Sequence, residues 1–186
     1  MADEIRTSDP QRIFLTGEPG TGKTTVMKRT AELLQVKGFK VGGLVTKEIR
    51  DNGIRTGFSI EDLATHEEGI LASVGSRDGP RVGKYTVNLR DLNEIGARAI
   101  RMAVDAADLV LIDELGPMEL HSHHFIEAVE TALGSSKHVL GTIHKRANHP
   151  LLREVKSSPK FTVLEVTLEN RDQMPDQILA RIARTR

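Results

Sequence analysis

An eight-residue segment near the start of the chain constrains the fold more than any other feature. Residues 17–24 read GEPGTGKT and match the phosphate-binding pattern G-x-x-x-x-G-K-[ST] in full. A short apolar run, Arg12–Thr16, precedes the segment, and apolar residues recur at helical spacing after it until Gly38. A strand, a glycine-rich loop and a helix are therefore predicted in that order, which is the setting in which this pattern binds phosphate.

The residue types of this loop suit the polyphosphate end of a nucleotide. Glycines let successive backbone N–H groups point inward around an anion, and the following helix adds the positive end of its dipole. Lys23 is expected to reach the β- and γ-phosphates as a catalytic residue, and the Thr24 hydroxyl is expected to bind Mg²⁺. The predicted nucleotide-binding residues of the loop are Gly17, Glu18, Pro19, Gly20, Thr21, Gly22, Lys23, Thr24 and Thr25.

A second candidate segment lies about 90 residues further on, where the second motif of phosphate-loop proteins is often found. The wholly apolar run Leu109–Ile112 reads as a buried strand and ends in two carboxylates. Asp113 is predicted to hold Mg²⁺, and Glu114 to orient or deprotonate an attacking water molecule. A capping aspartate followed by a solvated glutamate is the structural alternative. The stretch expected to border the nucleotide consists of Leu109, Val110, Leu111, Ile112, Asp113, Glu114, Leu115 and Gly116.

The acidic pair also separates subclasses of phosphate-loop proteins. Asp113 and Gly116 match the D-x-x-G element of GTP switches, but the chain contains no N-K-x-D tetrapeptide for reading guanine. A glutamate directly after the metal-binding aspartate is typical of water-activating ATPases, in which an extra strand lies between the two motif strands. The run Val139–Ile143 is the candidate for that strand. Thr142 and His144 at its end are candidate sensors of the γ-phosphate, with a buried hydroxyl and a surface imidazole as the alternative.

The remaining pattern predicts an α/β fold, with a mainly parallel sheet flanked by helices. Residues 41–50 and 54–60 read as strands joined by the turn signal Asp51-Asn52-Gly53, and further turns follow, so 41–90 is expected to be a β-hairpin-rich insert. Helices are predicted over Leu92–Ala107 with Asp91 as cap, near His123–Leu133, after Pro150 and within Asp172–Arg184, and a strand over Phe161–Val166. The length of 186 residues favours one domain over 1–186, with a loose lead-in over 1–10.

Composition excludes several classes of function. The chain has no Cys, which rules out disulfides and thiolate chemistry. Lys and Arg number 26 and Asp and Glu also number 26, so the net charge is zero, and only 3% of residues are aromatic. Both figures count against a nucleic-acid partner. No apolar run is long enough to span a membrane and the first residues are acidic, so a cytoplasmic location is expected. A monomer is expected rather than an oligomer.

Several further blocks of sequence share their order and spacing with one known family. They are 16–25 (TGEPGTGKTT), 42–46 (GGLVT), 55–58 (RTGF), 82–87 (VGKYTV), 112–120 (IDELGPMEL), 140–143 (LGTI) and 169–172 (ENRD). With these blocks the chain resembles, from about residue 12 to about residue 183, the small nucleoside-triphosphatases first described from thermophiles. The block at 112–120 and the spacing between blocks are specific to that family.

The resemblance implies a RecA-like phosphate-loop fold that hydrolyses the γ-phosphate of nucleoside triphosphates. It implies Mg²⁺ as the cofactor, ATP, GTP and other triphosphates as substrates, and a nucleoside diphosphate and phosphate as products. Turnover is expected to be slow unless a cation neutralises the transition state. Two alternatives stay open: a nucleotide or small-metabolite kinase with an acceptor site in the 41–90 insert, and a nucleic-acid-linked ATPase or nucleotide-dependent switch.

Other polar residues are weaker candidates for roles in such a site. Arg50, Arg55 and Arg171 are candidate sources of the neutralising cation, each with a surface charge as the alternative. Asn170 and Arg171 are also candidates for contact with the base or ribose. Glu119 is either a carboxylate that supports the acidic pair or a helix-start residue. The histidines at 121, 123 and 124 depart from the family pattern, and solvated side chains are expected there rather than a metal site.

Overall fold

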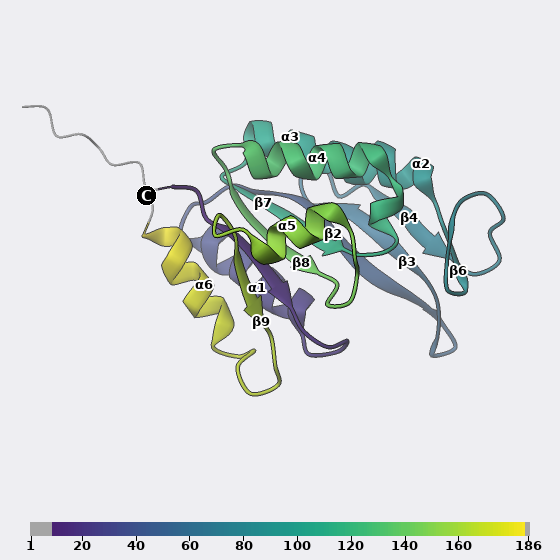
Figure 1. Ribbon diagram of the computed structural model, residues 1–186, viewed down its shortest axis with the longest axis horizontal. Helices are drawn as coiled ribbons and strands as arrows, with labels where there is room; N and C mark the ends of the chain where they lie inside the picture. The colour runs from purple at the N-terminus through teal and green to yellow at the C-terminus, as the bar shows by residue number, and fades with distance from the viewer. Residues whose placement is uncertain (1–8, 185–186) are drawn as a thin grey trace, which may run out of the picture.

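The sequence folds around one mixed β-sheet with helices on both faces (Figure 1). The computed structural model describes residues 9–184, so most of the lead-in expected over 1–10 lies outside the described residues. Within that range the strands run in the order β5-β6-β4-β3-β2-β7-β8-β1-β9. Their bounds are β1 Arg12–Thr16, β2 Val41–Asp51, β3 Ile54–Asp62, β4 Glu68–Ser73, β5 Arg81–Val82, β6 Tyr85–Val87, β7 Leu109–Leu115, β8 His138–Ile143 and β9 Thr162–Glu165.

Five adjacent strands, β2, β7, β8, β1 and β9, run parallel. The predicted extra strand is confirmed, because β8 pairs with β1 on one side and with β7 on the other. Parallel strands place their carboxyl ends at the same edge of a sheet. The loop after β1 and the acidic residues at the end of β7 therefore emerge at one edge.

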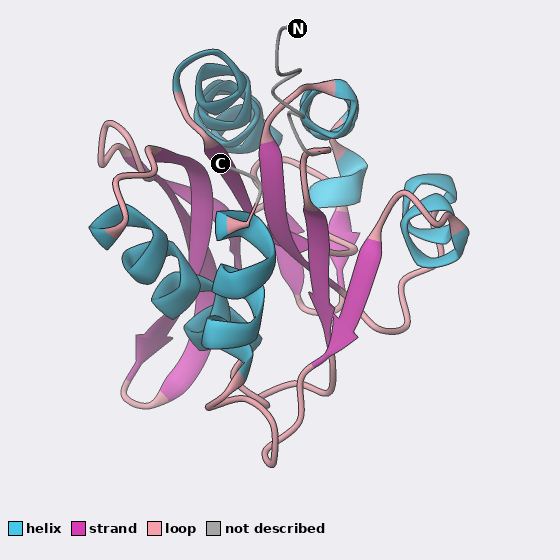
Figure 2. Cartoon of the chain, turned by 90° about the vertical axis from the view of Figure 1, so that its left-hand side faces the viewer, coloured by secondary structure: helices cyan, strands magenta, loops and turns pink. Residues whose placement is uncertain are grey.

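Two apolar layers explain why the central strands are apolar throughout. Alternate residues of a strand face opposite sides of the sheet, so Phe14 packs into one cluster while its neighbours Ile13 and Leu15 pack into the other. The first cluster includes residues of α3 (Arg98–Ala106), α4 (His123–Gly134) and α5 (Pro150–Ser157). The second includes residues of α1 (Lys23–Val36) and α6 (Met174–Ala183). Viewed end-on, the strands form a layer between helices (Figure 2).

The hairpin-rich region expected over 41–90 is present, but its boundary was wrong. The first residues of β2, from Val41 to Leu44, pair in parallel with Leu109–Ile112 of β7 and belong to the central sheet. Beyond them β2 continues as one arm of an antiparallel hairpin with β3, and β4, β6 and β5 extend the same sheet. The hydrophobic pattern could not reveal this, because one long strand serves both parts.

The helix predicted over Leu92–Ala107 begins earlier and has a different cap. It is built from α2 (Leu89–Asp91), a π-helical stretch η1 (Leu92–Ala97) and α3. The cap is the Asn88 side chain, which accepts a hydrogen bond from the Asp91 backbone N–H at 3.1 Å. Asp91 instead accepts from the Ile70 backbone N–H at 2.8 Å and so ties the helix to β4. Local preference for Asp at a cap was thus overridden by a tertiary contact.

The other predicted helices are confirmed, with small changes at their ends. Ser122 caps α4 by accepting a hydrogen bond from the Phe125 backbone N–H, and His149 caps α5 ahead of Pro150. A single 3₁₀ turn, η2 (Glu119–His121), links β7 to α4. Within residues 9–184 none of the helices combines the length and the apolar character that crossing a membrane requires.

Candidate active site

The phosphate loop connects β1 to α1 with a backbone that only glycine adopts easily. Gly17 has φ +146°, and a Cβ there would lie 2.5 Å from the Val166 carbonyl oxygen, in the chain that continues from β9. Gly22 has φ +99° and is the N-cap of α1, whose first N–H groups no side chain of the described residues caps. The helix start is therefore available to an anion.

Lys23 folds back over the loop. Its Nζ donates to the carbonyl oxygens of Gly17 at 3.0 Å and Glu18 at 3.1 Å. The ammonium group thus lies inside the loop, where a phosphate oxygen would replace these carbonyls as acceptor.

Asp113 ends the apolar part of β7 in a buried position, 2% exposed. Its Oδ1 accepts a hydrogen bond from the Thr142 hydroxyl at 2.7 Å, and its Oδ2 has no hydrogen-bond partner among the described residues. Burial raises the pKa of Asp113, while the hydroxyls of Thr142 and Thr24 and the charge of Lys28 lower it. The structure therefore brings Thr24, at the start of α1, to the predicted metal-binding carboxylate.

Glu114 follows directly and is half-buried. Burial and the charge of Asp113 raise the pKa of Glu114, and the charge of Lys23 opposes this rise. Asp113 and Lys23 thus both act electrostatically on Glu114. A carboxylate with a raised pKa is a better acceptor for a proton from water at neutral pH.

Glu119 lies beneath this pair on η2 and is almost completely buried, at 5% exposed. Its Oε2 accepts a hydrogen bond from the Gly116 backbone N–H at 3.1 Å. Burial, together with the charges of Glu114 and Asp113, raises the pKa of Glu119 to about 8. This carboxyl group therefore holds a proton at neutral pH and fixes the turn after β7, which agrees with a role supporting the acidic pair rather than a helix start alone.

Two candidate γ-phosphate sensors at the end of β8 have different surroundings. Thr142 is buried, and its hydroxyl donates to Asp113, so it orients the carboxylate. His144 is half-buried, and burial and the nearby charge of Lys23 lower its pKa. A neutral imidazole is thereby held close to the phosphate loop.

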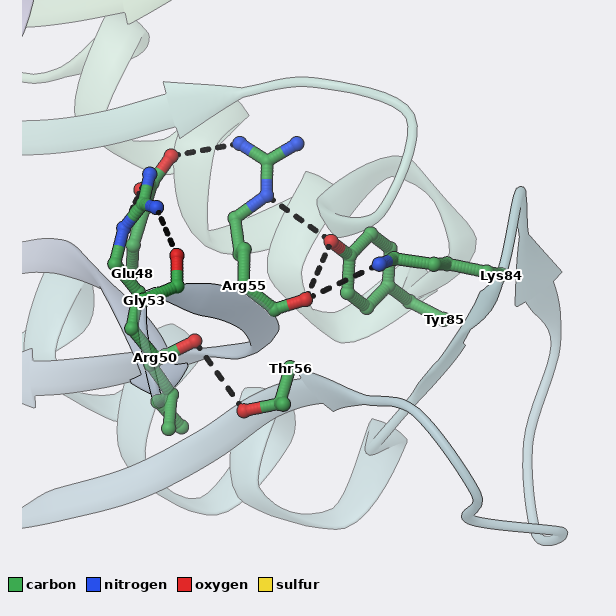
Figure 3. A network of polar contacts seen from close by, with 8 residues as sticks. Glu48, Arg50, Gly53, Arg55, Thr56, Lys84 and Tyr85 are labelled. Carbon is green, nitrogen blue, oxygen red and sulfur yellow. Dashed lines mark hydrogen bonds and ion pairs between the residues drawn. The ribbon is translucent and has the colours of Figure 1, made fainter.

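The structure does not bring Arg50 and Arg55 to the loop. Leu44 pairs with Ile112, and Arg50 lies six residues further along β2, roughly 20 Å away at about 3.3 Å per residue. Figure 3 shows that both arginines are held by Glu48 and that Arg55 also donates to the Tyr85 hydroxyl, at 3.0 Å. The Arg55 guanidinium also stacks over the ring of Phe58, 5.1 Å from its centroid.

Arg171 lies beside the loop, next to Gly22. With Gly22, Thr25, Val26, Arg29, Asp172 and Pro175 it lines a cavity of about 280 Å³ between α1 and α6. Asn170 faces the backbone instead: its side chain accepts from the Thr167 N–H at 2.9 Å and donates to the Glu165 carbonyl at 2.9 Å. Asn170 therefore shapes the loop that presents Arg171.

Sequence reasoning missed Lys145, which lies between β8 and α5. Its Nζ is 3.0 Å from Glu18 Oε1 of the phosphate loop and 2.9 Å from Glu165 Oε1 at the end of β9. Arg146 Nη2 lies 4.0 Å from Glu18 Oε2. The sequence offered one signal for this residue, its position: Lys145 and Arg146 directly follow the strand that separates β1 from β7.

The histidines after β7 form no metal site. His123 and His124 are exposed and both lie near Glu127, at 3.2 and 3.6 Å. In residues 9–184 no group of three or more His, Asp or Glu side chains is arranged to hold a metal ion.

The loop, the acidic strand and the strand between them define the class of protein. A glycine-rich loop on β1, carboxylates at the end of β7 and the intervening β8 are the core of a RecA-like P-loop NTPase. A family model described as NTPase matches residues 12–179 of the chain. The chain belongs to this family, whose similar members are nucleoside-triphosphatases named THEP1, and it is a nucleoside-triphosphate hydrolase.

This chain aligns with relatives and with solved structures along nearly its whole length. Identity is 53% over 174 residues to the nucleoside-triphosphatase THEP1 of Methanosarcina acetivorans, covering 93% of this chain and 97% of that protein. It is 49% over 174 residues to THEP1 of Thermofilum pendens, covering 93% and 96%. The crystal structure of THEP1 from Aquifex aeolicus superposes with a TM-score of 0.81 at 32% identity, covering 92% of this chain and 99% of that one. For the solution structure of a human cancer-related nucleoside triphosphatase the TM-score is 0.79 at 34% identity, covering 95% and 99%. The shared architecture therefore includes the sheet extension as well as the core.

Proposed function

We propose that the protein is a Mg²⁺-dependent hydrolase of the γ-phosphate of ATP, GTP and other nucleoside triphosphates. One observation supports this most directly: the buried Oδ2 of Asp113 has no hydrogen-bond partner within residues 9–184 and lies in the same site as Thr24, Lys23 and Glu114. A buried acceptor without a partner is costly unless a ligand satisfies it. Carboxylate and hydroxyl oxygens are the donors that Mg²⁺ prefers.

The proposed roles follow from these positions. Thr24 and Asp113 would hold Mg²⁺, which would supply positive charge to the phosphate oxygens. The backbone N–H groups of the loop and Lys23 would bind the phosphates. Glu114 would accept the proton of the attacking water, as the bond from water oxygen to γ-phosphorus forms and the bond to the β-phosphate oxygen breaks.

Broad base specificity is part of the proposal. The ribose and base would occupy the cavity beside Gly22, and the described residues that line this cavity include no aromatic or amide side chain for reading a base edge. Slow turnover, below about 1 s⁻¹, is also proposed, because Glu48 holds Arg50 and Arg55 away from the loop and Arg171 lies beside Gly22 in the cavity proposed for ribose and base. The protein is further proposed to act as a single-domain cytoplasmic monomer with nucleoside triphosphates as its partners.

The test is phosphate release from ATP, GTP, CTP and UTP, with Mg²⁺ or with a chelator. Wild type is expected to hydrolyse all four within about a tenfold range of kcat/KM, and only with Mg²⁺. Glu114→Gln should still bind nucleotide but lose at least about 100-fold in kcat, and Lys23→Ala should lose both binding and turnover. Lys160→Ala, an exposed charge change before β9, is the matched control.

Three outcomes would contradict the proposal. Absence of phosphate release from wild type would refute hydrolysis without a partner. Release that requires an added phosphate acceptor would point to a kinase instead, and stimulation by RNA or DNA would point to a nucleic-acid-linked ATPase.

A further inference from the structure

Lys145 forms an unusual ion pair with the phosphate loop itself. Glu18 is the second residue of that loop, so its carboxylate lies at the edge of a site built for anions. The Lys145 ammonium neutralises it at 3.0 Å, and also binds Glu165 at 2.9 Å. Hydrogen bonding to Lys145 is the largest cause of the lowered pKa of Glu18, with smaller effects of Arg146 and Lys23.

The position of Lys145 in the fold places it on the side where the γ-phosphate must lie. Lys145 follows β8. The Thr142 hydroxyl on β8 donates a hydrogen bond to Asp113, and the charge of Lys23 lowers the pKa of His144, which lies just after β8. Lys23 and Lys145 both bind Glu18, one at its carbonyl and the other at its carboxylate. The two ammonium groups therefore contact the same loop residue, at the edge where β1, β8 and β7 end.

The arginines considered from the sequence are less well placed than Lys145 to neutralise charge on the γ-phosphate. Arg50 and Arg55 lie far along the hairpin and are bound to Glu48. Arg171 lies next to Gly22 in the cavity proposed for ribose and base. Lys145 is 43% exposed, and its ammonium group is held by the surface carboxylates of Glu18 and Glu165, so its long side chain can change partners at little cost.

We propose that Lys145 is a catalytic residue that leaves Glu18 and binds the γ-phosphate oxygens as hydrolysis proceeds. This inference rests on the proposed hydrolase function and names a cation for it within the chain. The transition state spreads negative charge over the γ-phosphate oxygens, and an added cation stabilises it more than the ground state. An ammonium group cannot form the paired hydrogen bonds of a guanidinium, which agrees with slow turnover.

The test compares Lys145→Ala with variants that remove only its partners. Single-turnover phosphate release from Mg²⁺-ATP should fall about 100-fold or more in Lys145→Ala, the usual effect of removing one transition-state donor. The Kd for ADP should change less than about threefold. Trapping of ADP with aluminium fluoride, which mimics the transferring phosphate, should be lost. Lys160→Ala, with the same change in charge, should match wild type.

Glu165→Gln and Glu18→Gln separate catalysis from a purely structural role. Glu165→Gln removes one partner of Lys145 and should release phosphate at the wild-type rate. Glu18→Gln should release phosphate at least tenfold faster than Lys145→Ala. The inference is overturned if Lys145→Ala still traps ADP with aluminium fluoride and turns over within threefold of wild type. It is also overturned if either partner variant loses as much as Lys145→Ala. If wild type itself releases no phosphate, the proposed function fails, whatever the variants do.

Discussion

Replacing Glu119 with Gln should change how the stability of the protein depends on pH. Glu119 is 5% exposed, and its Oε2 accepts a hydrogen bond from the Gly116 backbone N–H. Gln has nearly the same shape and keeps a carbonyl oxygen for that bond. The substitution therefore removes the ability to ionise while leaving the packing of η2 almost unchanged.

The size of the effect follows from the pKa of Glu119, which burial and the charges of Glu114 and Asp113 raise from 4.5 to about 8. Between these two values the unfolded chain loses the proton and the folded protein keeps it, so the free energy of unfolding falls as pH rises. The slope from this group is about 1.4 kcal/mol per pH unit, or about 4 kcal/mol between pH 5 and pH 8. Glu119→Gln removes this loss. The free energy of unfolding of the variant minus that of wild type should therefore increase from pH 5 to pH 8 and then level off.

Urea unfolding at pH 5, 6, 7 and 8 measures this difference, with Glu130→Gln, an exposed position on α4, as the matched control. The control should follow wild type at every pH. A difference between Glu119→Gln and wild type that stays constant from pH 5 to pH 8 would show that the folded protein does not raise the pKa of Glu119. The electrostatic description of the acidic site would then be wrong.

Three further substitutions test the local structure. Ser122→Ala removes the cap of α4 and should lower the free energy of unfolding by about 1 kcal/mol, measured by urea denaturation; no change would mean that the cap is replaced by water. Gly17→Ala places a Cβ 2.5 Å from the Val166 carbonyl oxygen at φ +146°, so its nucleotide affinity in calorimetry should fall at least tenfold, and wild-type affinity would contradict the loop geometry. Asp113→Asn should abolish the effect of Mg²⁺ on the Kd for ADP, and a persisting effect would exclude Asp113 as a metal ligand.

The phosphate loop and the acidic strand were predictable because their chemistry depends on local residue types. Glycines and Lys23 lie within eight consecutive residues, and Asp113 and Glu114 directly follow an apolar strand. Resemblance to a family supplied the RecA-like arrangement, and β8 confirmed it. The cap of α2 was not predictable, because Asn88 and Asp91 are both good capping residues and only the position of β4 decides between them.

The arginines show a second limit of prediction from the sequence. Arg50, Arg55 and Arg171 are equal candidates when only residue type and rough position are known. Arg50 and Arg55 lie far from the phosphate loop because the hairpin of β2 and β3 is long. Arg171 lines the cavity between α1 and α6. Lys145 has no motif around it, and its contact with Glu18 joins residues more than 120 positions apart.

The chain's own residue pattern determined that phosphate would be bound by a loop between a strand and a helix, since backbone geometry and charge there are set by neighbours in sequence. Tertiary structure alone decided that Oδ2 of the buried Asp113 has no hydrogen-bond partner among the described residues, that Glu119 keeps its proton, and that Lys145 lies against the loop. These properties depend on desolvation and on distances across the sheet, and both exist only after distant strands have packed side by side.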